Sequence, residues 1–91
     1  MFIVVEHEIF NPKAFADTAR SAALPSSLKL HQTFPNREGT KAVCLWEAAG
    51  VDEVKVFVEG ALGKVSRNTY FAVEASNALG LPSGIMAAVT S

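Results

Sequence analysis

The order of hydrophobic periodicities along the chain limits its possible folds more than any other feature. Four segments have the alternating, β-branched or aromatic character of strands: residues 2–10, 28–34, 41–48 and 67–75. Two segments carry apolar residues at helical spacing, one starting at Asn11-Pro12 and the other after Gly50. The predicted order is therefore strand, helix, strand, strand, helix, strand.

This order is typical of the ferredoxin-like arrangement, in which two helices cover one face of a four-stranded antiparallel sheet. We predict an α+β fold with the order β-α-β-β-α-β, in a single domain with a core at residues 2–75 and a C-terminal tail at residues 76–91. A chain of 91 residues has room for one core only. Because a domain of this size buries a modest fraction of its surface, pairing with a second copy is favoured.

Charge and composition exclude several classes of partner. The chain has 8 Lys and Arg against 9 Asp and Glu, a net charge of −1, which argues against nucleic acid as a partner. It has no apolar run of the roughly 20 residues that span a bilayer, so no membrane partner is expected. Its single cysteine, and the lack of a secretion signal at its start, indicate the cytoplasm.

The two faces of the predicted sheet follow from the alternation of side chains along a strand. We assign the more aliphatic set to the helix-covered face: Ile3, Val5, Leu28, Leu30, Val43, Leu45, Phe71 and Val73. The opposite face then carries Phe2, Val4, Glu6, Lys29, His31, Thr33, Ala42, Cys44, Trp46, Tyr70, Ala72 and Glu74. A face this apolar is usually an interaction site, so we expect a homodimer formed through it. On this assignment Trp46→Lys weakens association.

Three stretches of the chain resemble a known superfamily: the valine-rich first strand ending near His7, the pair LKLHQTF and KAVCLWEA with an acidic helix start at Asp52, and NTYFAVE in the last strand. They are similar to the dimeric α+β barrel proteins, and closest to the small bacterial nickel-binding ferredoxin-like proteins of that superfamily. The resemblance implies two subunits packed sheet against sheet around a cavity. Other members are monooxygenases and isomerases, so the resemblance does not determine the chemistry.

The predicted hairpin places a histidine close to a cysteine. If Phe34 faces Lys41, then His31 lies opposite Cys44. Imidazole and thiolate both bind divalent metals such as Ni²⁺ or Zn²⁺, and two subunits together supply four such ligands. His7, which matches the family, is a further candidate ligand. The alternative is that Cys44 is simply a buried apolar residue and that the histidines are ordinary hydrogen-bonded side chains.

Carboxylates are the other candidates for chemistry on the expected dimer face. Glu6 and Glu74 come from strands that should be neighbours, and Tyr70 belongs to the same face. A carboxylate in an apolar cavity has a raised pKa and can accept a proton, as a cofactorless monooxygenase-like or isomerase-like enzyme needs. In that case Glu6 or His31 is the base. The alternative is that the carboxylates reach the rim of the cavity and form ion pairs.

Two classes of function therefore remain open. The first is a dimeric protein that binds a small hydrophobic molecule or a metal in the cavity between the sheets. The second is an enzyme acting there on a small hydrophobic cyclic substrate. Binding is favoured because the sequence shows no activated nucleophile and no stabiliser of negative charge. The candidate cavity residues are Glu6, His31, Cys44, Trp46, Tyr70 and Glu74.

The C-terminal tail is apolar but weakly patterned. We expect it to turn at Leu81-Pro82, because glycine and proline interrupt any regular element there. Residues 85–89 are then predicted to lie along a surface, at the sheet edge of the partner subunit or at the cavity mouth. The alternative is a disordered end, which is common for chain termini.

Overall fold

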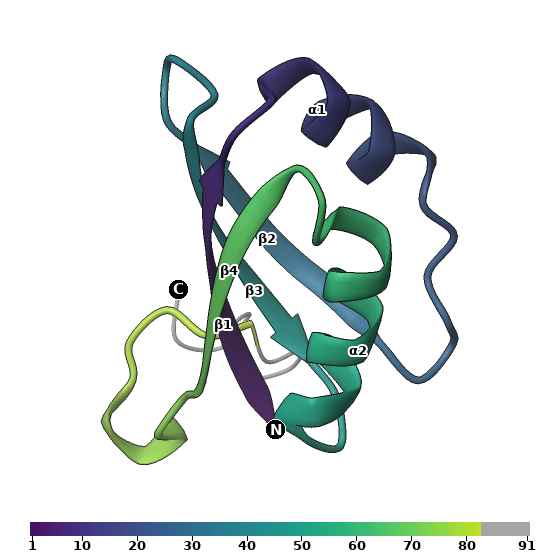
Figure 1. The fold of residues 1–91 in the computed structure, drawn as a ribbon. Helices are drawn as coiled ribbons and strands as arrows, with labels where there is room; N and C mark the ends of the chain where they lie inside the picture. Colours follow the sequence, from purple (N-terminus) through teal and green to yellow (C-terminus); the bar gives the residue numbers. More distant parts are fainter. Residues whose placement is uncertain (83–91) are drawn as a thin grey trace.

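The computed structural model describes residues 1–82. The elements in chain order are β1 (Phe2–Ile9), α1 (Pro12–Ser21), β2 (Lys29–Pro35), β3 (Lys41–Glu47), α2 (Val51–Leu62), β4 (Ser66–Ala72) and the short 3-10 helix η1 (Ala75–Asn77). The strands form one antiparallel sheet in the order β2-β3-β1-β4, and both helices lie on one face of it (Figure 1). This confirms the predicted ferredoxin-like α+β fold. The last strand ends three residues earlier than predicted, and the chain continues into η1.

Helix α1 begins where the sequence predicts. The Asn11 side chain accepts a hydrogen bond from the backbone N–H of Ala14 at 3.1 Å, and Pro12 occupies the first turn, where its missing N–H has no partner to lose. Phe15 is the buried residue of this helix. Local capping therefore starts α1, and Phe15 anchors it on the core.

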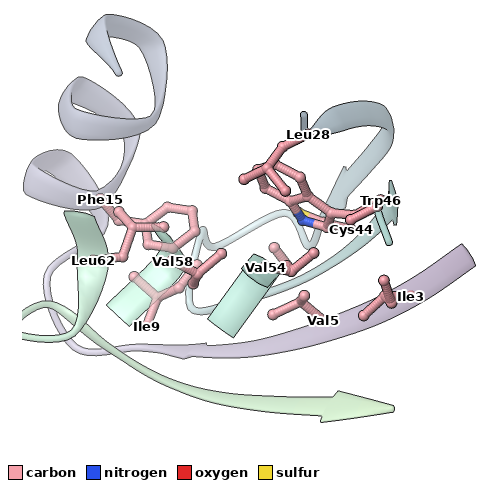
Figure 2. Close-up of a cluster of buried hydrophobic side chains, with 12 residues drawn as sticks. Ile3, Val5, Ile9, Phe15, Leu28, Cys44, Trp46, Val54, Val58 and Leu62 are labelled. Atoms are coloured by element: carbon pink, nitrogen blue, oxygen red, sulfur yellow. The ribbon is translucent and has the colours of Figure 1, made fainter. Parts of the chain in front are cut away.

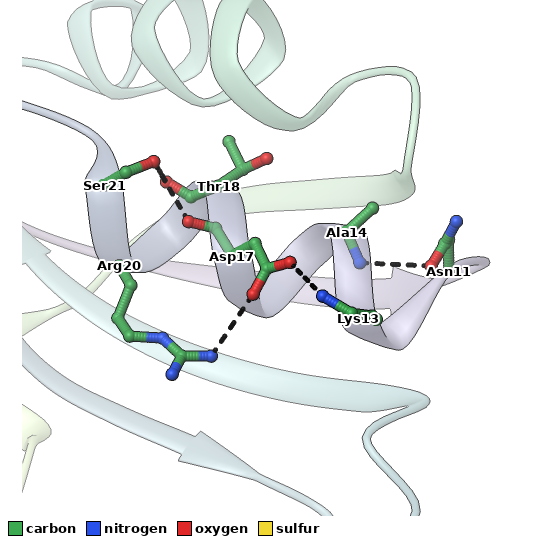
Figure 3. Close-up of polar contacts among 7 residues, drawn as sticks. All are labelled: Asn11, Lys13, Ala14, Asp17, Thr18, Arg20 and Ser21. Carbon is green, nitrogen blue, oxygen red and sulfur yellow. Dashed lines mark hydrogen bonds and ion pairs between the residues drawn. The ribbon is translucent and has the colours of Figure 1, made fainter.

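The outward side of α1 is charged. Asp17 pairs with Lys13 at 2.7 Å and with Arg20 at 3.6 Å, one turn away on either side (Figure 3). All three side chains are more than half exposed, so these ion pairs contribute little to stability. This side of the helix is a solvated surface, as its sequence pattern indicates.

The turn between β2 and β3 is stabilised by one side chain. Asn36 Oδ1 accepts hydrogen bonds from the backbone N–H of Thr40 at 2.9 Å and of Lys41 at 3.1 Å. Gly39 has a φ of 75°, in the left-handed region that glycine adopts without strain. The predicted hairpin is confirmed.

Helix α2 packs on the sheet with its regularly spaced apolar residues. Val54, Val58 and Leu62 are buried, as the spacing of the sequence predicts. The acidic Asp52 and Glu53 lie in the first turn, where the helix dipole favours negative charge. Neither α2 nor any other helix in residues 1–82 is long and apolar enough to cross a membrane.

The core lies between the helices and the sheet. The β3 side chains that face it are the set that the sequence analysis assigned to the opposite face. Cys44 and Trp46 are buried there, with exposed fractions of 5% and 4% (Figure 2). β3 pairs with β1 so that Ile3 is opposite Trp46 and Val5 is opposite Cys44. Residues that are opposite each other in an antiparallel sheet point to the same face. Trp46 and Cys44 therefore lie under the helices together with Ile3 and Val5.

The fourth strand is also turned over relative to the prediction. Tyr70 is opposite Val5, and it is therefore on the helix-covered face, whereas Phe71 is opposite Val4 on the other face. The placement of Cys44, Trp46 and Tyr70 on a shared dimer face was wrong. Helix packing, not subunit pairing, accounts for the burial of these side chains.

We call the sheet face away from the helices the outer face. Its apolar residues are Phe2, Val4, Phe34, Val43, Leu45, Phe71 and Val73. Phe34, Val43 and Phe71 are 62%, 41% and 49% exposed. A second apolar sheet face thus exists, as predicted, and Phe2 and Val4 belong to it as expected. Val43, Leu45, Phe71 and Val73 also lie on it, although the prediction assigned them to the helix-covered face.

The chain after β4 runs along the outer face (Figure 1). Residues 78–81 and the outer face enclose a groove of about 300 Å³ whose walls include Phe34, Val43 and Phe71. Leu81 and Pro82 are half-buried. The predicted docking of residues 85–89 lies outside the described part of the chain.

Candidate functional site

The predicted contact between His31 and Cys44 does not form. Cys44 is opposite Thr33, and Phe34 is opposite Val43 and not Lys41. Farther from the turn, the strand also has a bulge between Leu30 and Gln32, at His31. The Cys44 thiol donates a hydrogen bond to the Thr33 hydroxyl at 3.6 Å. The register error and the extra residue at the bulge together separate the two predicted metal ligands.

His31 belongs to the outer face. Its Nε2 is 2.8 Å from Oε1 of Glu47, and its ring centroid is 5.6 Å from that of Phe2. The hydrogen bond from His31 lowers the pKa of the Glu47 carboxyl below its ordinary value. His31 and Cys44 therefore lie on opposite faces of the sheet and cannot bind one metal ion within a single chain.

The predicted cluster of carboxylates around Tyr70 does not form either. Glu6 is exposed on the outer face, and Glu74 is exposed just before η1. Tyr70 instead donates a hydrogen bond to Glu59 of α2 at 2.5 Å. Within residues 1–82, no group of three or more His, Cys, Asp or Glu side chains is placed to hold a metal ion.

A largely enclosed cavity of about 60 Å³ lies between the helices and the sheet. Three residues singled out from the sequence, His7, Cys44 and Trp46, come together in its wall on the sheet side. The helices contribute mainly apolar side chains, among them Phe15, Ala19, Ala22, Phe57, Val58, Ala61 and Leu62. The volume is several times the minimum that one water molecule needs, so a small molecule of a few heavy atoms can occupy it.

The polar atoms of the cavity wall have unequal environments. Burial raises the pKa of the Cys44 thiol, so this side chain stays a neutral thiol. Trp46 packs its ring against Phe57 with centroids 5.9 Å apart. Its indole N–H is buried and has no hydrogen-bond partner among residues 1–82.

His7 is held by a polar network that reaches the surface. Its Nδ1 is 2.6 Å from Asn68 Oδ1, which also accepts a hydrogen bond from the Ser66 hydroxyl at 2.8 Å. The Asn68 amide nitrogen in turn donates to Glu59 at 2.9 Å. Because the Asn68 oxygen can only accept, we assign the ring proton of His7 to Nδ1, which leaves Nε2 as the acceptor of the neutral ring.

Burial lowers the pKa of His7 below its ordinary value of 6.5, although its hydrogen bond to Asn68 opposes the shift. The unfolded chain therefore takes up this proton at a higher pH than the folded protein. We expect the contribution of His7 to the free energy of unfolding to be fully present above about pH 6.5. It falls as the pH drops below about 6.5, until the folded-state pKa is reached.

Urea unfolding of the native protein and of His7→Gln between pH 8 and pH 5 measures this effect, with a shallower pH dependence expected for the variant. Glu59 does not obscure it, because hydrogen bonds from Tyr70 and Asn68 lower the Glu59 pKa, and stability linked to that group is lost only in more acidic solution. Equal slopes for the two proteins would contradict the assignment of a buried, neutral His7.

Sequence reasoning missed the residues that hold His7. Ser66 and Asn68 alternate with the exposed Arg67 and Thr69 along β4, which is the pattern of polar side chains turned toward the interior. Their distance from His7 along the sequence does not predict the contact, because it depends on the pairing of His7 with Asn68 across β1 and β4.

Comparisons with known proteins add no assignment to the cavity. No protein-family model matches the chain, and neither a search of curated proteins nor a search of solved structures finds a match. The fold and the cavity are therefore the observations on which a function can be based.

Proposed function

We propose that this protein is a homodimeric binding protein that holds a small hydrophobic molecule without converting it. The observation that carries the proposal is the cavity between the helices and the sheet, where His7, Cys44 and Trp46 meet an otherwise apolar wall. Concave apolar sites with few polar groups are the usual form of small-molecule sites. The proposed ligand site therefore lies inside each subunit, and not between two sheets.

Binding is favoured over catalysis by the states of the polar groups. A nucleophilic cysteine needs a lowered pKa, whereas burial raises the pKa of Cys44. The bases considered from the sequence, Glu6 and His31, belong to the outer face and do not line this cavity. The alternative of a cofactorless enzyme thus has less support than a binding role.

Filling the cavity tests the ligand site. Ala61 lines the cavity, and we expect Ala61→Leu to weaken binding of the probe 2-methylpropene by about tenfold or more, because the added side chain occupies the space. Methyl chemical shifts in an NMR titration report the affinity. The matched control is Ala16→Leu on the exposed side of α1, which should bind as the native protein does.

The proposal would be abandoned if the native protein did not bind the probe. The same conclusion would follow if Ala61→Leu folded normally and still bound it with native affinity.

The outer face supplies the proposed dimer surface. It exposes Phe34, Val43 and Phe71, a contiguous apolar area of the kind that marks interaction sites. Charges of both signs also lie beside one end of it, where Arg67 is 3.9 Å from Glu8. A mixed-charge, apolar face does not repel a copy of itself, so a second copy of this chain is the occupant that it suits.

A second candidate function is binding of Ni²⁺ or Zn²⁺ between two copies, and it is favoured by the contact between His31 and Glu47 on the outer face. Imidazole and carboxylate are suitable ligands for both metals, and two subunits would supply four of them. Calorimetric titration with each metal should show binding that His31→Ala abolishes and His7→Ala preserves. Undiminished binding by His31→Ala would contradict this candidate.

A further inference from the structure

We propose that the ligand of the cavity is a neutral, mainly apolar molecule with one hydrogen-bond acceptor oxygen, and that this oxygen binds the indole N–H of Trp46. Small ketones, aldehydes and ethers belong to this class. The inference rests on the proposed function and names the chemistry of the molecule that the cavity selects.

The first observation is the unpaired donor. Trp46 is 4% exposed, and its Nε1 has no hydrogen-bond partner among residues 1–82. Buried N–H groups in native proteins nearly always have a partner, either in the protein or in an ordered water molecule, so a buried N–H without one calls for an explanation. Because Trp46 is part of the cavity wall, an acceptor in the cavity is next to the side chain that lacks one.

The second observation is the charge of the wall. No Lys or Arg is among the described residues that line the cavity, so a carboxylate or phosphate there would have no cation to compensate it. The thiol of Cys44 is neutral and already donates to Thr33, and burial favours the neutral form of His7. A neutral ligand is the only kind for which this wall imposes no penalty for buried charge.

The third observation is the apolar environment of the donor, the indole N–H of Trp46. Trp46 packs against Phe57, and Val58 and Leu62 line the same cavity. An acceptor oxygen that enters this site loses its bonds to water and recovers one of them at Trp46. The cavity should therefore distinguish two molecules of equal shape when one of them has the oxygen and the other does not.

The experiment compares two such probes. Acetone and 2-methylpropene have nearly the same shape, with four heavy atoms each, but only the ketone has an acceptor oxygen. Trp46 is the single tryptophan of the chain, so its indole N–H gives one assignable signal in a ¹⁵N-labelled sample. We expect the ketone to move this proton signal downfield at saturation, and the alkene to leave it without a downfield shift.

Trp46→Phe supplies the matched variant, because it keeps an aromatic ring in the core and removes the donor. We expect it to weaken binding of acetone about tenfold more than it weakens binding of 2-methylpropene. If the variant does not fold, the shift comparison in the native protein decides the question alone.

The outcomes separate this inference from the proposed function. If both probes bind, the indole signal does not move downfield with the ketone, and Trp46→Phe weakens both equally, the acceptor inference is wrong and the binding function stands. If the indole proton contacts a bound water molecule that persists at saturating ketone, the inference is also wrong. If neither probe binds, the proposed function itself fails.

Discussion

Phe71→Lys is expected to convert the proposed dimer into a monomer that remains folded. Phe71 is 49% exposed on the outer face, directly opposite Val4 in the sheet, so the isolated subunit tolerates a charge there. In the dimer the same charge is buried without a partner, which costs roughly 3 to 5 kcal/mol, or a factor of at least about 100 in the dissociation constant. Sedimentation analysis at micromolar concentration measures the change.

Val56→Lys is the control for this substitution. Val56 is 75% exposed on α2, on the side of the sheet away from the outer face, and the same charge there should leave association unchanged. A monomeric native protein would refute the dimer, and a dimeric Phe71→Lys variant would refute its assignment to the outer face.

Trp46→Lys should prevent folding, which is a larger effect than the weakened association predicted from the sequence. Removal of a buried tryptophan side chain alone costs roughly 3 to 5 kcal/mol, and an unpaired charge in the core adds to that cost. A domain of 91 residues has a total stability of roughly 5 to 14 kcal/mol. The variant should therefore show no cooperative unfolding transition by circular dichroism.

The conservative change Trp46→Phe tests whether charge, and not loss of the indole alone, causes this result. It should retain a cooperative transition at lower denaturant concentration, because most of the buried apolar surface remains. A Trp46→Lys protein that folds and is merely monomeric would show instead that Trp46 lies at a subunit interface, as the face assignment from the sequence supposed.

Much of the fold could be predicted because its determinants are local. Asn11-Pro12 contains a cap and a preformed first turn, and Asn36 and Gly39 meet the conformational needs of one short hairpin. The apolar spacing of Val54, Val58 and Leu62 describes one side of a helix without reference to any other element. Such interactions extend over a few residues, so the sequence states them directly.

The faces of the sheet could not be predicted in the same way. In β3 both alternating sets are apolar, Ala42, Cys44 and Trp46 on one side and Val43 and Leu45 on the other. In β4 the aromatic residues Tyr70 and Phe71 are adjacent, so each face receives one of them. Alternation carries no information when both sets have the same character, and the aliphatic preference used to choose between them was misleading.

The candidate site also depends on how the strands pair and on which face of the sheet each residue lies. His7 is buried on the helix side of β1, and the exposed Glu6 and Glu8 on either side of it mark the opposite face. Its network with Asn68 and the bulge at His31 could not be predicted, because both arise from pairing between strands.

The sequence by itself determined the order of the elements, most of their ends and the presence of two apolar sheet faces, because these follow from short-range periodicity and capping. Only the tertiary structure decided which residues form each face and which of them meet at the cavity. The physical reason is that strand register is set by the packing of the whole sheet against its helices. A shift of one residue moves a side chain such as Cys44 from the outer face to the core.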